Sequence, residues 1–151
     1  MDRTEARQTL DALVGIWRMD VDLPGADAAG VDARVEFAWD LHGAFLVQRS
    51  QIPIPEAPDS LAIIALDHDG GGFTQHYFDQ RGVVRLYAMT LAGSVWTLTR
   101  TAPDFTPLDF CQRYVGTISA DGAAIDGRWE TAPVGTEDWE LDFHLAHRRV
   151  M

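Results

Sequence analysis

Hydrophobic and polar residues alternate along most of the chain with a period of two residues. The clearest example is Val31–Asp40, where every odd position from 31 to 39 is apolar and charged residues fill most even positions. Such alternation predicts a β-strand with one buried face. Turn-forming residues interrupt the pattern at short intervals, so the chain is predicted to be a series of short strands joined by tight turns.

About ten strands are expected on this basis. They are Ile16–Leu23, Val31–Asp40, Ala44–Ile52, Leu61–Asp67, Phe73–Asp79, Val83–Leu91, Val95–Thr101, Phe110–Ser119, Ala124–Ala132 and Trp139–Val150. Most connections have hairpin length, and no βαβ spacing occurs. Sequential antiparallel strands must close or stack as two sheets, because open edges promote aggregation. We predict an all-β fold, an antiparallel up-and-down barrel of about ten strands that could enclose a small ligand.

One short helix is predicted before the first strand, over Thr4–Val14. Thr4 is a candidate N-cap, and the apolar residues with helical spacing are Ala6, Leu10, Leu13 and Val14. Gly15 follows, and a glycine at a helix end permits a left-handed turn without strain. Trp17 then begins the alternation of the first strand.

Composition limits the classes of partner. The 151 residues suggest one domain, 1–151, and 46% of them are hydrophobic. The net charge of −11 repels phosphate backbones and anionic lipids. We therefore expect no nucleic acid or membrane partner. The polar N-terminus is unlike a secretory leader and Cys111 is the single cysteine, which together favour a cytoplasmic location.

The order of these features resembles the lipocalin-like, or calycin, superfamily. The matching residues are Gly15-Ile16-Trp17 and a late arginine, Arg148 or Arg149. The whole chain is similar to an uncharacterised group of bacterial lipocalin-like proteins in the motifs Tyr77–Gly82, Trp96–Arg100, Gly127–Glu130 and Trp139–Phe143. The resemblance implies that the tryptophan packs across one barrel end under the arginine. Because Arg149 shares the odd, apolar phase of the last strand with Trp139, Leu141 and Phe143, we expect it to cover Trp17, with the helix across the same end.

The candidate site is a set of polar and aromatic residues on neighbouring middle strands. Its members are His76, Tyr77, Asp79, Arg85, Tyr87, Trp96, Arg100, Tyr114 and Trp129. They either converge in the cavity, where they could orient a ligand carboxylate or serve as acid and base, or form a cross-strand ladder outside the barrel. If Arg85 is interior, it needs a partner, and Asp79 or Glu130 is the nearest candidate.

Four functional hypotheses follow. The first is a binder of a small hydrophobic or amphipathic molecule, and the second is an enzyme of the cyclase or isomerase type. The third is haem binding: the chain resembles nitrobindin-like haem barrels in size and strand count, with His144 and His147 as candidate ligands, and alternation places His147 inside. That group's second glycine after G-x-W is missing here, where Arg18-Met19-Asp20 follows.

The fourth hypothesis is a structural module, for instance a homodimer in which outward tryptophans pack against a second subunit. No metal site is predicted. The triplet Asp67-His68-Asp69 resembles a ligand set, but alternation sends neighbouring side chains to opposite faces.

Overall fold

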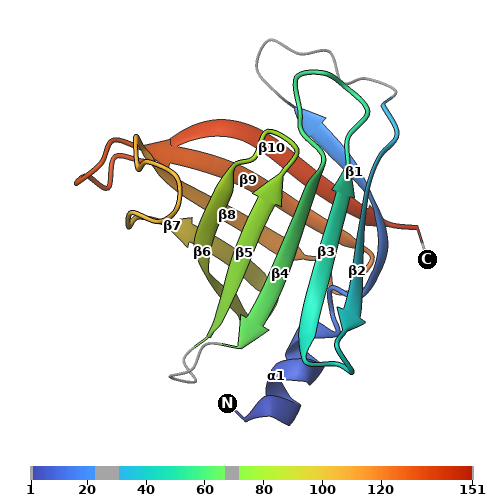
Figure 1. The fold of residues 1–151 in the computed structure, drawn as a ribbon. Coiled ribbons are helices and arrows are strands. Elements are labelled where there is room, and N and C mark those ends of the chain that lie inside the picture. Colours follow the sequence, from blue (N-terminus) through green and yellow to red (C-terminus); the bar gives the residue numbers. More distant parts are fainter. Residues whose placement is uncertain (1, 23–30, 67–71, 151) are drawn as a thin grey trace.

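The computed structural model describes residues 2–22, 31–66 and 72–150 (Figure 1). Within them the chain forms one helix, α1 (Arg3–Leu10), and ten strands. The strands are β1 (Gly15–Asp22), β2 (Ala33–Asp40), β3 (Phe45–Gln51), β4 (Ser60–Leu66), β5 (Phe73–Asp79), β6 (Val84–Ala92), β7 (Val95–Arg100), β8 (Cys111–Ile118), β9 (Ala124–Ala132) and β10 (Glu140–Arg149).

The strands close into one antiparallel barrel. Each strand pairs with its neighbours in the sequence, and β1 pairs with β10 to complete the ring. The predicted all-β, up-and-down barrel with a short N-terminal helix is therefore confirmed. Closure leaves none of the ten described strands at a free sheet edge, which removes the aggregation hazard of an open meander.

The alternating pattern decides which residues fill the barrel. Apolar side chains of one phase point inward and are buried, and charged side chains of the other phase face out. The largest fully buried side chains are Trp17, Trp96, Tyr114, Phe37, Leu13, Leu46, Ile64, Met89, Ile125 and Val35. At about 25 cal/mol per Å² of apolar surface removed from water, these side chains supply most of the driving force for folding.

Helix α1 differs from its prediction at both ends. Asp2, not Thr4, is the N-cap: its carboxylate accepts a hydrogen bond from the Glu5 amide at 2.8 Å, and the Glu5 carboxylate accepts from the Asp2 amide at 3.0 Å. This reciprocal pair is a capping box, which satisfies two free amides of the first turn. The helix ends at Leu10 instead of Val14.

Residues 11–14 continue as tighter turns, in which the amides of residues 12–14 bond to the carbonyl three residues back, and barrel side chains satisfy the free carbonyl groups of this segment. Trp17 Nε1 donates to the Leu13 carbonyl at 2.9 Å, and Arg149 Nη1 and Nη2 donate to the carbonyls of Val14 at 2.5 Å and Ala12 at 2.9 Å. Gly15 has φ +132°, as a left-handed turn requires, but it lies at the entry to β1 and not at the helix end.

The predicted contact between Arg149 and Trp17 is present. The two residues are cross-strand partners in β10 and β1, and the Arg149 guanidinium carbon lies 4.1 Å from the centre of the Trp17 ring. Trp17 is completely buried, and its neighbours in the core include Ala6, Leu10 and Leu13 of the N-terminal segment. Helix α1 lies at the lower end of the barrel in Figure 1, and the N-terminal segment contacts both Trp17 and Arg149.

Most predicted strand limits are displaced by one or two residues, and the expected ends at Leu23 and Asp67 lie outside the described residues. Strand β10 shows a larger difference. Its register shifts between Leu141 and Phe143, because a β-bulge inserts Asp142. Leu141 therefore faces outward and is 55% exposed, whereas Phe143 and every second residue after it follow the predicted inward phase.

Candidate functional site

A cavity of about 290 Å³ lies inside the barrel. It is bounded by Glu56–Pro58 of the β3–β4 connection and by Arg81 of the β5–β6 turn, which Figure 1 places at the barrel end opposite α1. Its apolar and aromatic lining consists of Met19, Val21, Ile52, Tyr77, Tyr87, Trp96, Leu98, Tyr114, Trp129, Phe143 and Leu145. Its polar lining includes Gln48, Ser50, Ser60, Gln75, Arg85, Gln112 and His147.

Seven aromatic rings form a continuous path from the closed end to the mouth. In order they are Trp17, His147, Trp96, Tyr114, Trp129, Tyr87 and Tyr77, with successive centroid separations of 6.3, 6.1, 5.1, 5.3, 5.6 and 6.3 Å. Edge-to-face and tilted contacts of this length stabilise aromatic clusters beyond their buried area. One side of the cavity is therefore a preformed aromatic wall.

Two glycines let the Tyr114 ring lie against this wall. Gly116 of β8 and Gly127 of β9 are cross-strand partners. A Cβ atom on Gly116 would stand 2.6 Å from Tyr114 Oη, and a Cβ atom on Gly127 would collide with the same ring. Larger residues at either position would push the ring toward the cavity, so the glycine pair helps to keep the cavity open.

Gln112 of β8 organises the polar side of the cavity. Its Oε1 atom accepts hydrogen bonds from Arg85 Nη1 at 3.1 Å and from the Tyr87 hydroxyl at 3.0 Å. Burial raises the pKa of Tyr87, so its hydroxyl stays protonated and donates. The amide thereby fixes a guanidinium and a phenol that belong to the same strand, β6.

A second polar group lies at the mouth. The Asp79 carboxylate accepts from the Tyr77 hydroxyl at 2.9 Å and from Arg81 Nη2 at 2.6 Å. Burial opposes ionisation of Asp79, but hydrogen bonds from Arg81 and Tyr77 outweigh it and lower the pKa of the carboxyl. Burial, aided by the Asp79 charge, raises the pKa of Tyr77. Asp79 is thus an ionised structural partner of Tyr77 and Arg81.

Arg85 does not pair with either predicted carboxylate. Asp79 is engaged by Arg81, and Glu130 is engaged on the outer surface by Arg113 at 2.9 Å. Arg113 and Glu130 share the outward phase of β8 and β9, whereas Arg85 points inward with Tyr87 and Met89. Among the described residues Arg85 forms no ion pair.

Four buried side-chain polar atoms have no hydrogen-bond partner among the described residues. They are Arg85 Nε, Trp96 Nε1, Tyr114 Oη and His147 Nδ1. All four belong to residues that line the cavity. Because a buried polar group without a partner costs about 1–3 kcal/mol, each of these atoms needs a partner beyond the described residues, such as a water molecule or a ligand group.

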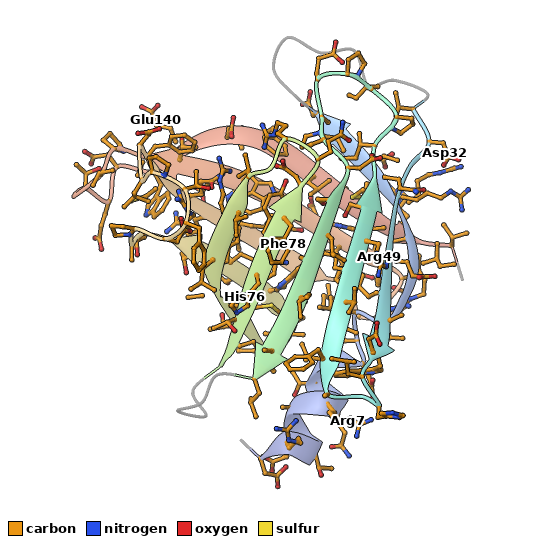
Figure 2. The ribbon with its side chains drawn as sticks, viewed as in Figure 1. Arg7, Asp32, Arg49, His76, Phe78 and Glu140 are labelled. Atoms are coloured by element: carbon orange, nitrogen blue, oxygen red, sulfur yellow. The ribbon has the colours of Figure 1, made fainter. Side chains whose placement is uncertain are left out.

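Six of the nine predicted site residues line this one cavity: Tyr77, Arg85, Tyr87, Trp96, Tyr114 and Trp129. Because these six side chains point inward, they form the cavity cluster and not the alternative ladder on the outer face of the barrel. Asp79 does not line the cavity itself, but it accepts hydrogen bonds from Tyr77 and Arg81, which do. His76 was predicted as a cavity residue but does not line the cavity. Alternation along β5 places it on the outer face with Phe78, as Figure 2 shows.

Arg100 was also predicted as a cavity residue, but it is buried outside the cavity lining. Its Nε and Nη2 atoms donate to the Asp104 carboxylate at 2.8 and 2.7 Å. Asp104 in turn accepts from the Leu86 amide at 2.8 Å, and Thr106 bonds to the backbone of Val84. The β7–β8 connection thereby forms hydrogen bonds with backbone groups of β6 in the part of that strand that does not pair with β7. Arg100 therefore holds the barrel wall together at that point.

The polar residues that the sequence did not single out are glutamines. Gln112 holds Arg85 and Tyr87, and Gln75 Nε2 donates to Gln48 Oε1 across β5 and β3 at 2.9 Å. Gln75 has the phase of Tyr77, and Gln112 that of Tyr114. Phase was the signal that could have found them, once the inward face of these strands was known.

His147 faces inward, as its phase predicted, and is 2% exposed. Its imidazole lies between the rings of Trp17 and Trp96 and makes no hydrogen bond to a described residue. Burial lowers the pKa of His147 from 6.5 to about 4, since the apolar surroundings disfavour the charged form. The ring is therefore neutral at pH 7.

This burial predicts a loss of stability in mild acid. The unfolded chain binds a proton at His147 near pH 6.5 and the folded chain only near pH 4, so the contribution is complete above the upper value and is lost as the pH falls between them. The expected size is roughly 3 kcal/mol. Urea unfolding of His147→Leu at pH 7 and pH 4 should show a smaller acid-induced loss than the wild type. His144→Leu, on the outer phase of β10, should keep the wild-type loss; equal losses in all three proteins would contradict the assignment.

Comparisons with known proteins bear on the fold. No protein-family model matches the chain, and no curated protein matches it. The crystal structure of Rv2717c from M. tuberculosis is similar over 99% of this chain and 100% of that chain, with 20% identity and a TM-score of 0.62. This likeness shows the barrel fold alone, and membership of the lipocalin-like superfamily stays a prediction.

The described residues contain neither a metal-binding cluster nor a membrane-spanning helix. No group of three histidine, cysteine, aspartate or glutamate side chains there is placed to hold a metal ion, and the triplet Asp67-His68-Asp69 lies outside the described residues. The described part of the chain contains no helix with the length and apolar character needed to cross a membrane.

Proposed function

We propose that this barrel binds a small hydrophobic or amphipathic molecule in its cavity. The observation that carries the proposal is an aromatic wall together with buried polar atoms, on four lining residues, that have no partner among the described residues. Ligand pockets are typically apolar cavities with a few well-placed polar groups. Gln112, which fixes Arg85 and Tyr87 from behind, gives the cavity a preorganised polar side.

The cavity sets the size of the ligand. Its volume of about 290 Å³ is near the lower end of ligand pockets. A compact molecule with an apolar body therefore matches the cavity best.

The cavity favours binding over catalysis of the acid–base type. Asp79 is tied to Tyr77 and Arg81, and His76 lies outside the barrel. No described carboxylate hydrogen-bonds to His147, so no oriented histidine–carboxylate pair is present among the described residues. Such a pair within hydrogen-bond reach is the usual geometry of a general base.

Haem fits the described residues poorly. His147 points inward, but its buried Nδ1 atom has no hydrogen-bond partner among the described residues. A metal-ligating histidine normally donates its second ring N–H to an oxygen atom, which fixes the ring. The cavity volume of about 290 Å³ also favours a smaller molecule than a tetrapyrrole.

Titration calorimetry with 1-octanol tests the proposed function. We expect saturable binding at one site with a Kd below about 1 mM. Gly127→Ala should weaken it by about tenfold or more, because the new methyl group drives the Tyr114 ring into the cavity. Arg128→Ala, on the outer face of the same strand, should leave the affinity unchanged. No saturable binding, or equal affinities for both variants and the wild type, would contradict the proposal.

A further inference from the structure

We infer that the ligand carries a carboxylate group, which Arg85 binds through its guanidinium. This inference rests on the proposed function and adds the chemical class of the ligand. Three observations support it: the free donors of the guanidinium, the balance of charges around the cavity, and the way in which the side chain is held.

The hydrogen bonding of Arg85 leaves part of the guanidinium without a partner among the described residues. Nη1 donates to Gln112 at 3.1 Å, and no other atom of the group bonds to a described residue. Nε is buried and has no described partner, and no described residue accepts from Nη2. Nη2 can therefore donate to a carboxylate oxygen, and a charge-assisted contact of this kind is stronger than one between neutral groups.

The charges around the cavity select an anion. The charged residues that line it are Glu56, Arg81 and Arg85. Arg81 is neutralised by Asp79, and Glu56 is exposed on the β3–β4 connection. Arg85 is left as a half-buried cation without a described counter-ion, in a chain whose net charge is −11. A half-buried charge without a counter-ion is costly, and a ligand anion would remove that cost.

The position of Arg85 is preset by its neighbours. Gln112 Oε1 accepts from both Arg85 and Tyr87, so the guanidinium is oriented before a ligand arrives. A receptor group that is already held loses little side-chain freedom on binding. From this point the aromatic path runs from Tyr87 through Trp129 toward the closed end, which gives the apolar body of the acid a continuous surface.

Matched eight-carbon ligands separate the headgroup from the body. Titration calorimetry at pH 7 with octanoate, 1-octanol and octyl phosphate compares a carboxylate, a neutral hydroxyl and a tetrahedral anion on one chain. We expect octanoate to bind about tenfold or more tightly than 1-octanol. Octanoate should also bind more tightly than octyl phosphate, because the guanidinium can bind either anion and the phosphate group is the bulkier one for a cavity of this size.

Variants of Arg85 test the assigned residue. Arg85→Met should remove the preference for octanoate and leave the affinity for 1-octanol within about threefold, which also reports an intact fold. Arg85→Lys keeps the charge but loses the planar guanidinium, and should retain only part of the preference. Arg49→Met, which removes an exposed arginine from the outer face of β3 (Figure 2), should behave as the wild type.

The outcomes distinguish the two proposals. Equal wild-type affinities for octanoate and 1-octanol would overturn the carboxylate inference and leave the proposed function standing. A preference for octanoate that survives in Arg85→Met, or tighter binding of octyl phosphate, would also overturn the inference. If none of the three molecules binds the wild type, the proposed function fails and the inference fails with it.

Discussion

Trp17→Ala is expected to lower the free energy of unfolding by about 3–5 kcal/mol, the usual cost of replacing a buried tryptophan with alanine. Trp17 is completely buried, and its removal leaves a void between the N-terminal segment and the barrel. The hydrogen bond from its indole to the Leu13 carbonyl and the stacking of Arg149 are lost as well. Urea unfolding followed by circular dichroism measures the change.

Trp139→Ala is the matched control for this experiment. Trp139 lies under the Arg113 guanidinium, 4.3 Å from the ring centre, on the outer surface. Loss of an exposed cation–π contact of this kind costs about 0.5–1 kcal/mol. A Trp17→Ala protein as stable as Trp139→Ala would show that the Arg149–Trp17 end of the barrel does not hold the fold together.

Arg100→Met is expected to destabilise the protein by about 3–5 kcal/mol, because it leaves a buried carboxylate without its counter-ion. The side chains of Arg100 and Asp104 are 2% and 4% exposed. The Arg100 hydrogen bonds are the main cause of the depressed pKa of Asp104. Since that folded pKa lies below the unfolded value, the stabilisation is present above about pH 4 and is lost as the pH falls further.

The double variant Arg100→Met, Asp104→Asn isolates the uncompensated charge. At pH 7 it should be more stable than Arg100→Met alone, because the neutral amide removes the buried charge and still accepts a hydrogen bond from the Leu86 or Thr106 amide. Chemical denaturation of the two variants makes the comparison. If the second substitution lowers stability further, the loss in Arg100→Met does not come from the carboxylate of Asp104.

The two-residue alternation of apolar and polar positions and the turn-forming residues predicted the barrel well. In an antiparallel barrel every strand has one face toward solvent and one toward the interior. The inward phase of β6 followed from Val83, Tyr87, Met89 and Leu91, and Arg85, which shares that phase, lines the cavity. The contact between Arg149 and Trp17 was predicted from phase together with family resemblance.

The errors come from local backbone geometry and from interactions between distant parts of the chain. The helix was predicted to reach Val14, but residues 11–14 form tighter turns, in which the amides of residues 12–14 bond to the third residue back, and the spacing of apolar residues does not distinguish such turns from an α-helix. The β-bulge after Leu141 shifts the strand register, so the residues before it point to the face opposite to the one predicted. Arg100 has the inward phase of Trp96 and Leu98, yet Asp104 holds it at the barrel wall, which alternation alone does not show.

The contact between Arg149 and the N-terminal segment has a consequence for the order of folding. The hydrogen bond from Arg149 to the Ala12 carbonyl joins residues 137 positions apart, and the pairing of β1 with β10 spans almost the same distance. Contacts of such long sequence separation carry a large loop-closure entropy and slow the folding of β-proteins. During synthesis, β1 leaves the ribosome well before its partner exists. The ring therefore closes only when the final strand is released, and until then the edge of β1 is open to pairing with other chains.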